Sequence, residues 1–257
     1  MSTSPAVPES DPVEPRTDPL DDVARRLEGR RPEEILAFAA DHLGPRVGFA
    51  TGFGPEGCLL LDVIARHRLP IEAFTLDTGL LFPETYALWR RLEERYHLRI
   101  RGVRPALGVA DQARLHGPRL WERDPDRCCQ MRKVEPLRAA LSGLDAWVSA
   151  IRRDQTTERR DAKVVERDHR FGLVKVNPLA GWTGEEVWAY LRANEVPFNP
   201  LHSEGYPSIG CRPCTTPVLD GENPRAGRWR QRGKVECGLH LRIVSSRPVP
   251  RLEGRSG

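Results

Sequence analysis

The chain has 257 residues, of which 39% are hydrophobic and 30% charged, and its formal net charge is +4. This length suits one large α/β domain with appendages, and the nearly balanced charge gives little support to a nucleic-acid-binding function. No apolar run approaches the roughly 18 residues of a membrane-spanning helix, so we expect no membrane partner.

The first 19 residues are rich in Pro, Ser, Asp and Glu. Such a segment cannot bury enough apolar surface to become ordered, and without an apolar core it is not typical of a secretory signal. We therefore expect residues 1–19 to form a disordered tail on a cytoplasmic protein, in which cysteines stay reduced.

Strands and helices alternate after this tail. The sequence predicts strands at 46–50, 71–76, 98–103 and 146–151, and helices at 58–67, 83–97, 128–141 and 183–194. Strands separated by helices of this length indicate an α/β fold, with a mostly parallel sheet and helices on both faces. We expect this domain to span residues 20–200, a loop-rich closing segment of the same domain to span 201–241, and a disordered tail to span 242–257.

Ligands of such folds bind beyond the carboxyl ends of the strands. Two predicted loops fall there, the glycine-rich loop 52–57 after the first strand and the loop 76–79 after the second. We therefore expect the functional site at this edge of the sheet.

Four of the six cysteines form two close pairs, Cys128-Cys129 and Cys211-x-x-Cys214. Soft thiolates bind zinc, copper(I) or iron–sulfur clusters, and the spacing alone leaves zinc and a cluster both open. We place the adjacent cysteines at a helix start, where both thiols can lean toward one face. Cys58, by contrast, lies in an apolar helical run and is interpreted as a core residue.

Cys237 stands apart in a polar segment that is rich in arginine and lysine. Positive neighbours stabilise a thiolate over a thiol, so they lower the pKa of the cysteine and activate it as a nucleophile. The same arginines are suited to clamp phosphate or sulfate oxygens. This segment therefore predicts a nucleophilic cysteine and an anionic substrate.

Taken together, these residues resemble the phosphoadenylyl/adenylyl sulfate reductase family. More narrowly, they are similar to the assimilatory adenylyl sulfate (APS) reductases that carry a 4Fe–4S cluster. The resemblance spans about residues 47–241 and is densest in 128–137, 176–215 and 236–240.

The resemblance implies a fold of the adenine-nucleotide α-hydrolase type and an oxidoreductase of sulfate assimilation. Such an enzyme reduces APS to sulfite and AMP through an S-sulfocysteine, with thioredoxin or glutaredoxin as the reductant. The resemblance also implies one 4Fe–4S cluster per chain, held by Cys128, Cys129, Cys211 and Cys214. Members specific for the 3′-phosphorylated substrate (PAPS) generally lack these cysteines. Their presence therefore favours APS, with PAPS or dual activity as the alternative.

The resemblance also assigns roles to single residues. The catalytic group is Cys237 as nucleophile, with Lys133, Arg225, Arg228 and His240 around the phosphosulfate. The substrate-binding group is Phe53, Gly54 and Glu56 of the phosphate loop, Leu76, Asp77, Thr78 and Gly79 beside the adenosine, and an arginine from Arg152 and Arg153. The phosphate loop departs from the family pattern Ser-Phe-Gly-x-Glu-Asp, because Gly57 stands at the last acidic position.

Two other interpretations compete with this one. A tRNA-thiolating enzyme of the same fold typically carries an intact Ser-Gly-Gly-x-Asp-Ser loop, which residues 51–57 do not contain. An iron–sulfur redox sensor that binds nucleic acid would need an autonomous basic element such as a helix-turn-helix, and we find none in the sequence. We expect a homo-oligomer with a small-molecule substrate and no nucleic-acid partner.

Overall fold

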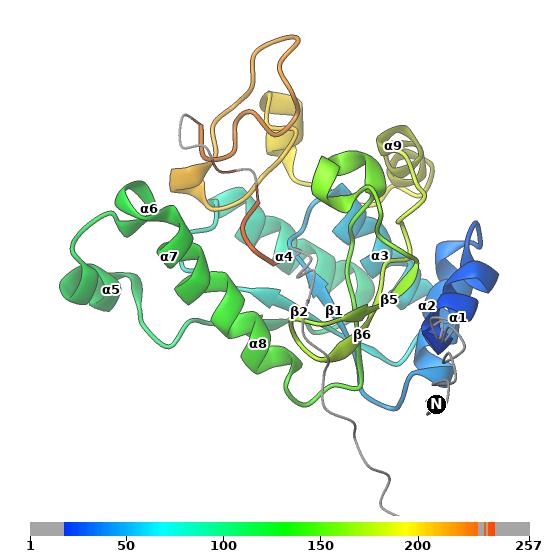
Figure 1. Cartoon of the computed structure of the whole chain (residues 1–257). Helices are drawn as coiled ribbons and strands as arrows, with labels where there is room; N and C mark the ends of the chain where they lie inside the picture. The colour runs from blue at the N-terminus through cyan, green and yellow to red at the C-terminus, as the bar shows by residue number, and fades with distance from the viewer. Residues whose placement is uncertain (1–17, 231–233, 235, 240–257) are drawn as a thin grey trace, which may run out of the picture.

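The computed structural model describes residues 18–230, 234 and 236–239, whose elements are shown in Figure 1. Within this part of the chain the strands are β1 (Val47–Thr51), β2 (Ile71–Leu76), β3 (Arg101–Val103), β4 (Ala146–Val148), β5 (Val165–Asp168) and β6 (Leu173–Val176). The α-helices are α1 (Pro19–Leu27), α2 (Pro32–His42), α3 (Pro55–Arg66), α4 (Pro83–Tyr96), α5 (Val109–His116), α6 (Leu120–Arg123), α7 (Pro125–Cys129), α8 (Glu135–Leu141) and α9 (Gly184–Ala193). Among the described residues, every helix is too short or too polar to span a lipid bilayer.

The strands form one sheet in the order β3-β2-β1-β4-β6-β5. Neighbouring strands are parallel except β5 and β6, which form an antiparallel hairpin at one edge. This arrangement confirms the predicted α/β fold with a mostly parallel sheet. The strand order changes direction between β1 and β4, and their carboxyl ends therefore open the crevice in which such folds bind ligands.

Helices cover both faces of the sheet. On one face, α2, α3, α4 and α9 enclose the main hydrophobic core. On the other face, α8 packs Leu137 and Leu141 against Phe74 and Trp147 of the sheet. Figure 1 shows α8 in front of the strands, with α3 and α4 behind them.

The β5–β6 hairpin is an element that the sequence did not predict. Charged residues at positions 166–168 and at Lys175 obscure the apolar pattern that identifies a strand. In the hairpin, Glu166 pairs with Lys175, and the carboxylate lies 3.4 Å from the ammonium with both side chains largely buried. The cross-strand pair therefore buries two charged side chains of a kind that is typical of exposed positions.

The predicted helix over 128–141 is not continuous. It begins earlier, at Pro125, where the carboxylate of Asp124 accepts a hydrogen bond of 2.9 Å from the Arg127 N–H. A π-helical turn (Gln130–Val134) then separates α7 from α8. The adjacent cysteines therefore lie at the end of α7 and not in its first turn. Such π-turns occur frequently at functional sites.

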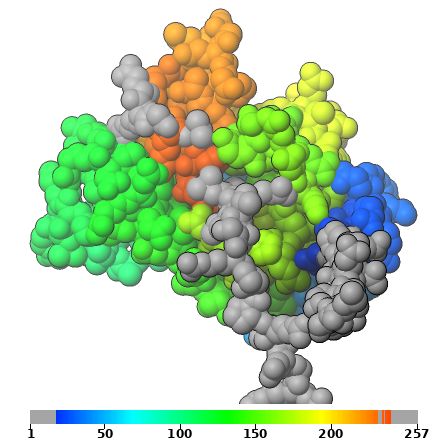
Figure 2. All heavy atoms as spheres, viewed as in Figure 1, coloured from blue at the N-terminus to red at the C-terminus, as the bar shows by residue number. Residues whose placement is uncertain are grey.

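The closing segment contains two short 3₁₀ turns, Pro200–Glu204 and Arg212–Cys214. Figure 1 shows it, coloured yellow to red, above the carboxyl ends of the strands, and Figure 2 shows its orange part at the top of the molecule. The predicted tails lie almost wholly outside the described residues. Helix α1, however, already begins at Pro19, inside the predicted first tail.

A buried carboxylate fixes α3, and with it the loop that precedes α3. Asp62 is fully buried and accepts hydrogen bonds from the Tyr96 hydroxyl at 2.8 Å and the Tyr190 hydroxyl at 2.7 Å. Arg66 Nε donates a third hydrogen bond of 3.0 Å. These donors lie on α4, α9 and α3, so one side chain fixes the mutual positions of the three helices.

We predict that Asp62→Ala lowers the free energy of unfolding by about 2–4 kcal/mol, because two partly buried hydroxyls lose their acceptor. Urea denaturation followed by circular dichroism measures this change. The control is Asp41→Ala at an exposed position of α2, which should change stability by less than about 0.5 kcal/mol. Equal stability of the parent and the Asp62 variant would contradict this anchoring role.

Candidate active site

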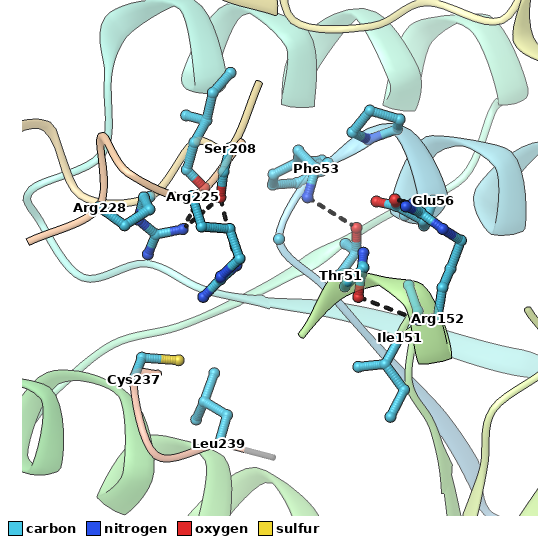
Figure 3. A pocket seen from close by; sticks show the side chains of 18 of the residues that line it. Thr51, Phe53, Glu56, Ile151, Arg152, Ser208, Arg225, Arg228, Cys237 and Leu239 are labelled. Carbon is cyan, nitrogen blue, oxygen red and sulfur yellow. Dashed lines mark hydrogen bonds and ion pairs between the residues drawn. The ribbon is translucent and has the colours of Figure 1, made fainter. Parts of the chain in front are cut away.

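A cavity of about 590 Å³ opens at the carboxyl ends of β1, β2 and β4. Its walls come from the loops that follow these strands and from the closing segment above them. Figure 3 shows it from close by. The cavity therefore lies at the edge of the sheet where the sequence places the site.

Most of the predicted catalytic and substrate-binding residues line this cavity. They are Phe53, Gly54, Glu56, Leu76, Thr78, Lys133, Arg152, Arg225, Arg228 and Cys237. Asp77, Gly79 and Arg153 are not among the lining residues. His240 lies outside the described residues.

The loop between β1 and α3 makes a tight turn at Phe53, whose φ of 59° is left-handed. The Phe53 N–H donates a hydrogen bond of 3.1 Å to Thr51 Oγ1. A Cβ atom on Gly57 would lie 2.6 Å from the same Oγ1. Gly57 therefore makes room for the Thr51 hydroxyl, which explains its departure from an acidic residue. The loop leads into the N-terminus of α3, where unpaired N–H groups favour an anion.

The two neighbouring arginines after β4 point to different places. Arg152 lines the cavity and forms ion pairs with Glu56 and Asp154. Arg153 instead points toward α1, where its two terminal nitrogens lie 2.7 and 2.8 Å from the carboxylate oxygens of Glu28. Of the two predicted arginines, only Arg152 lines the cavity.

Asp77 and Gly79 shape the loop after β2 without lining the cavity. The Asp77 carboxylate accepts hydrogen bonds from the Tyr86 hydroxyl at 2.6 Å and the Gly79 N–H at 3.1 Å. Burial opposes ionisation, but these hydrogen bonds and the nearby Arg104 lower the pKa of Asp77 below its usual value. The charged side chain therefore holds the turn from which Thr78 reaches the cavity.

Cys237 is half-buried, and Figure 3 shows its sulfur pointing into the cavity. Burial opposes ionisation of the thiol. The pKa of Cys237 is nevertheless lowered below its usual value by the charge of Lys133, the Leu239 N–H and the charge of Arg228. The neighbouring Glu236 carboxylate acts in the opposite direction. A thiol with a lowered pKa that faces a cavity is suited to nucleophilic attack.

Arg225 and Arg228 reach the cavity from the closing segment. Their Nη1 atoms donate to the Ser208 hydroxyl, at 3.4 Å from Arg225 and 3.2 Å from Arg228. Arg228 also stacks on the Trp229 ring, with its guanidinium carbon 4.5 Å from the ring centroid. These contacts hold two cations beside the space that Cys237 faces.

Two further charged residues at the cavity were missed in the sequence analysis. The carboxylate of Glu236 is 3% exposed and lies 2.8 Å from Arg159 Nη2 and 3.4 Å from Arg225 Nη2. Arg159 and Glu236 are 77 positions apart. No local pattern predicts such a pair, although the position of Glu236 directly before Cys237 was a signal that could have been followed.

The four paired cysteines line a second, small cavity next to the first. Its lining residues are Leu80, Trp121, Pro125, Cys128, Cys129, Arg132, Lys133, Cys211 and Cys214. Burial raises the pKa of the Cys128 and Cys129 thiols, and it raises the pKa of Cys214 to about 11. Positive charge beside these thiols favours their thiolate forms; Lys133 supplies part of it for Cys129 and Cys214, and a bound metal group would supply more.

The donor set of this cavity fits an iron–sulfur group. Thiolates are the ligands that such clusters use. Polar groups beside two of the sulfurs are suited to orient them. The Thr78 hydroxyl lies 3.3 Å from Cys211 Sγ. Gln112 Nε2 lies 3.8 Å from Cys128 Sγ. Within the described residues, no group of three or more His, Cys, Asp or Glu side chains is arranged to hold a single metal ion. The fit therefore rests on the shared cavity and on the chemistry of its thiols.

Lys133 belongs to both cavities. Its side chain is buried, which opposes a positive charge, but the thiolates of Cys211, Cys237 and Cys129 raise the pKa of Lys133 above its usual value. Its Nζ also lies 5.7 Å from the centroid of the Trp229 ring. A fixed positive charge therefore stands between the cysteine-lined cavity and the candidate nucleophile.

Comparison with known proteins gives concordant results. Residues 46–217 match the family described as the phosphoadenosine phosphosulfate reductase domain. The chain is 48% identical to the phosphoadenosine 5′-phosphosulfate reductase of Gloeobacter violaceus, over 86% of this chain and 93% of that protein. It is 47% identical to adenosine 5′-phosphosulfate reductase 1 of Bacillus subtilis, over 80% of this chain and 89% of that protein.

Solved structures show the same likeness. The phosphoadenylyl-sulfate reductase of Candida auris, in a phosphate complex, superposes with a TM-score of 0.70 and 30% identity, covering 79% of this chain and 99% of that chain. An FMN adenylyltransferase of Candida glabrata gives a TM-score of 0.54 at 16% identity, covering 83% of this chain and 72% of that chain. The second likeness concerns the fold alone.

We predict that Lys133→Met slows alkylation of Cys237 by iodoacetamide several-fold at pH 7. Loss of the neighbouring charge raises the pKa of Cys237, and only the thiolate reacts. Mass spectrometry of the Cys237 peptide over a pH series measures the rate, and the profile should move to higher pH. Lys163→Met, at an exposed lysine that pairs with Asp21, should leave the profile in place. An unshifted profile in the Lys133 variant would show that this charge does not act on Cys237.

Proposed function

Because the chain belongs to the phosphoadenosine phosphosulfate reductase family, we propose that it is an oxidoreductase that reduces adenosine 5′-phosphosulfate to sulfite and AMP. The observation that carries this proposal is the half-buried Cys237, whose lowered pKa and surrounding cations suit attack on an anionic group. The reductant is thioredoxin, or glutaredoxin in its place. We place this reaction in the cytoplasm, where cysteines such as the free thiols of this chain stay reduced.

The cavity offers different chemistry at its two ends. Lys133, Arg225 and Arg228 gather positive charge near Cys237, which suits the phosphosulfate. The loop of Phe53 and Gly54 and the N-terminus of α3 lie at the other end. We assign this end, together with Leu76, Thr78 and the Glu56–Arg152 pair, to the nucleotide. His240 remains a predicted phosphosulfate contact.

The reaction is balanced with APS and the thioredoxin dithiol as its two reactants. The Cys237 thiolate attacks the sulfur of the substrate, the bond from that sulfur to the phosphate oxygen breaks, and AMP leaves. Cys237 then carries an S-sulfonate. A thioredoxin thiolate attacks Cys237 Sγ, and sulfite leaves, after which the second thioredoxin thiol releases Cys237 as thioredoxin becomes a disulfide. Two electrons pass from the dithiol to the sulfate sulfur.

The main physical obstacle is repulsion between an anionic nucleophile and an anionic sulfonyl group. Two unit charges 4 Å apart repel each other by about 4 kcal/mol at an effective dielectric constant of 20. Positive charges fixed before the reaction offset this repulsion without reorganisation during it. Lys133, Arg225 and Arg228 are already held by their neighbours, so they are suited to this task.

We also propose that Cys128, Cys129, Cys211 and Cys214 hold a 4Fe–4S cluster. When bound, this group would tie the α7–π-turn segment to the loop of Cys211 and Cys214. Lys133 lies in the π-turn that directly follows α7, so such a tie would support its position between the two cavities.

A second candidate substrate is PAPS, alone or together with APS. It is favoured by the 48% identity to a relative named phosphoadenosine 5′-phosphosulfate reductase. Other relatives of similar identity are named adenosine 5′-phosphosulfate reductases. Sulfite production from the two nucleotides therefore has to be compared directly.

We predict that the anaerobically purified protein releases sulfite from APS faster than from PAPS when thioredoxin is present. Cys237→Ser should abolish sulfite release with both nucleotides while AMP binding and the brown colour of the cluster remain, because the variant lacks only the nucleophile. Mass spectrometry after mixing with APS should find the sulfonate on Cys237 of the parent. An adduct on a different residue, or no thioredoxin-dependent sulfite, would refute the proposal.

We predict that Cys214→Ser lowers the iron and labile sulfide bound per chain, since one thiolate ligand is lost. Cys58→Ser is the matched control. Cys58 is fully buried, its thiol donates to the Phe53 carbonyl oxygen at 3.7 Å, and it lies outside the cysteine-lined cavity. The control should keep its iron. Full iron content in the Cys214 variant would remove this residue from the ligand set.

A further inference from the structure

Cys237 lies on a short segment without regular secondary structure, formed in the described part by Lys234 and residues 236–239; we call it the nucleophile segment. Its ends are attached to the body of the protein. Lys234 Nζ contacts the Pro125 carbonyl oxygen at 3.4 Å, and the Gly238 carbonyl oxygen accepts a hydrogen bond from Arg170. Leu239 packs against the apolar cluster under α8.

The attachment nearest to the sulfur is the buried carboxylate of Glu236. Arg159 Nη2 lies 2.8 Å from one carboxylate oxygen and 3.0 Å from the other. Arg225 Nη2 lies 3.4 Å from the second oxygen, and the Thr156 hydroxyl lies 3.5 Å from the first. Arg159 also donates to the Gln155 side-chain oxygen, which fixes its direction. Glu236 is thus bound from the loop after β4 and from the closing segment together.

We propose that Glu236 is the positioning residue of the nucleophile: its carboxylate, bridged by Arg159 and Arg225, holds the Cys237 sulfur in the cavity in line with the substrate.

Two physical arguments support this role over others. First, a carboxylate in a cavity for an anionic substrate repels that substrate, so it is tolerated only because two guanidinium groups bind it. Second, Glu236 opposes the ionisation of Cys237, so it does not serve to activate the thiol. The remaining role of Glu236 is to hold the backbone of the nucleophile segment in place. The two arginines make charge-assisted hydrogen bonds to the residue directly before the nucleophile.

This inference rests on the proposed function, because the effect of Glu236 is measured as the rate at which the Cys237 S-sulfonate forms. The variant is Glu236→Gln, which keeps the shape of the side chain and removes its charge. The matched control is Glu222→Gln. Glu222 forms a bidentate pair with Arg230 at 2.8 Å for each contact, in the same part of the chain but outside the cavity lining.

In single-turnover experiments at saturating APS, Glu236→Gln should slow adduct formation by about 10²-fold, because a displaced nucleophile loses its near-attack geometry. The dissociation constant of AMP should stay close to that of the parent. Alkylation of Cys237 by iodoacetamide should become faster, since the segment is released and the opposing charge is gone. Glu222→Gln should match the parent in all three measurements.

Adduct formation at the parental rate in Glu236→Gln would overturn the inference. So would a parallel loss of AMP binding and adduct formation, which indicates a general structural role. If the parent itself forms no adduct on Cys237 from APS, the proposed function fails, and that result is distinct from either outcome in the variant.

Discussion

The rest of the site depends on the interaction between the buried ammonium of Lys133 and the cysteines around it. It lines both the substrate cavity and the cysteine-lined cavity, and thiolates on both sides raise its pKa. A charge in this position is expensive to bury unless it is compensated. Cys129, Cys211 and Cys237 compensate it in their thiolate forms, so cysteines that are distant in the sequence share one counter-charge.

Charge balance also governs the other wall of the substrate cavity. Arg159, Arg225 and Arg228 supply positive charge there, and Glu236 neutralises part of it. In the proposed reaction, the segment that carries Cys237 approaches the substrate and then exposes its sulfur to a thiol of the reductant. Arginine suits this wall, because its five donors can bind a carboxylate and a substrate oxygen together.

The fold was predicted best where local pattern and tertiary environment agree. The strand at 71–76 and the helix from Pro83 were found within one residue of their observed bounds, because apolar runs and a proline at the helix start identify them. The β5–β6 hairpin was missed, since its charges are compensated only across the two strands. The π-turn after Cys129 was missed as well, because nothing in its composition distinguishes it from an α-helix.

The sequence by itself determined the kinds of chemistry: four thiols in two pairs, a solitary cysteine among cations, and loops placed after parallel strands. Residue type and spacing carry this information because they are local. Only the tertiary structure decided that Arg152 and not Arg153 reaches the cavity, that Asp77 supports its loop from behind, and that Glu236 meets Arg159. Successive side chains diverge, and contacts between distant positions exist only after the chain has folded.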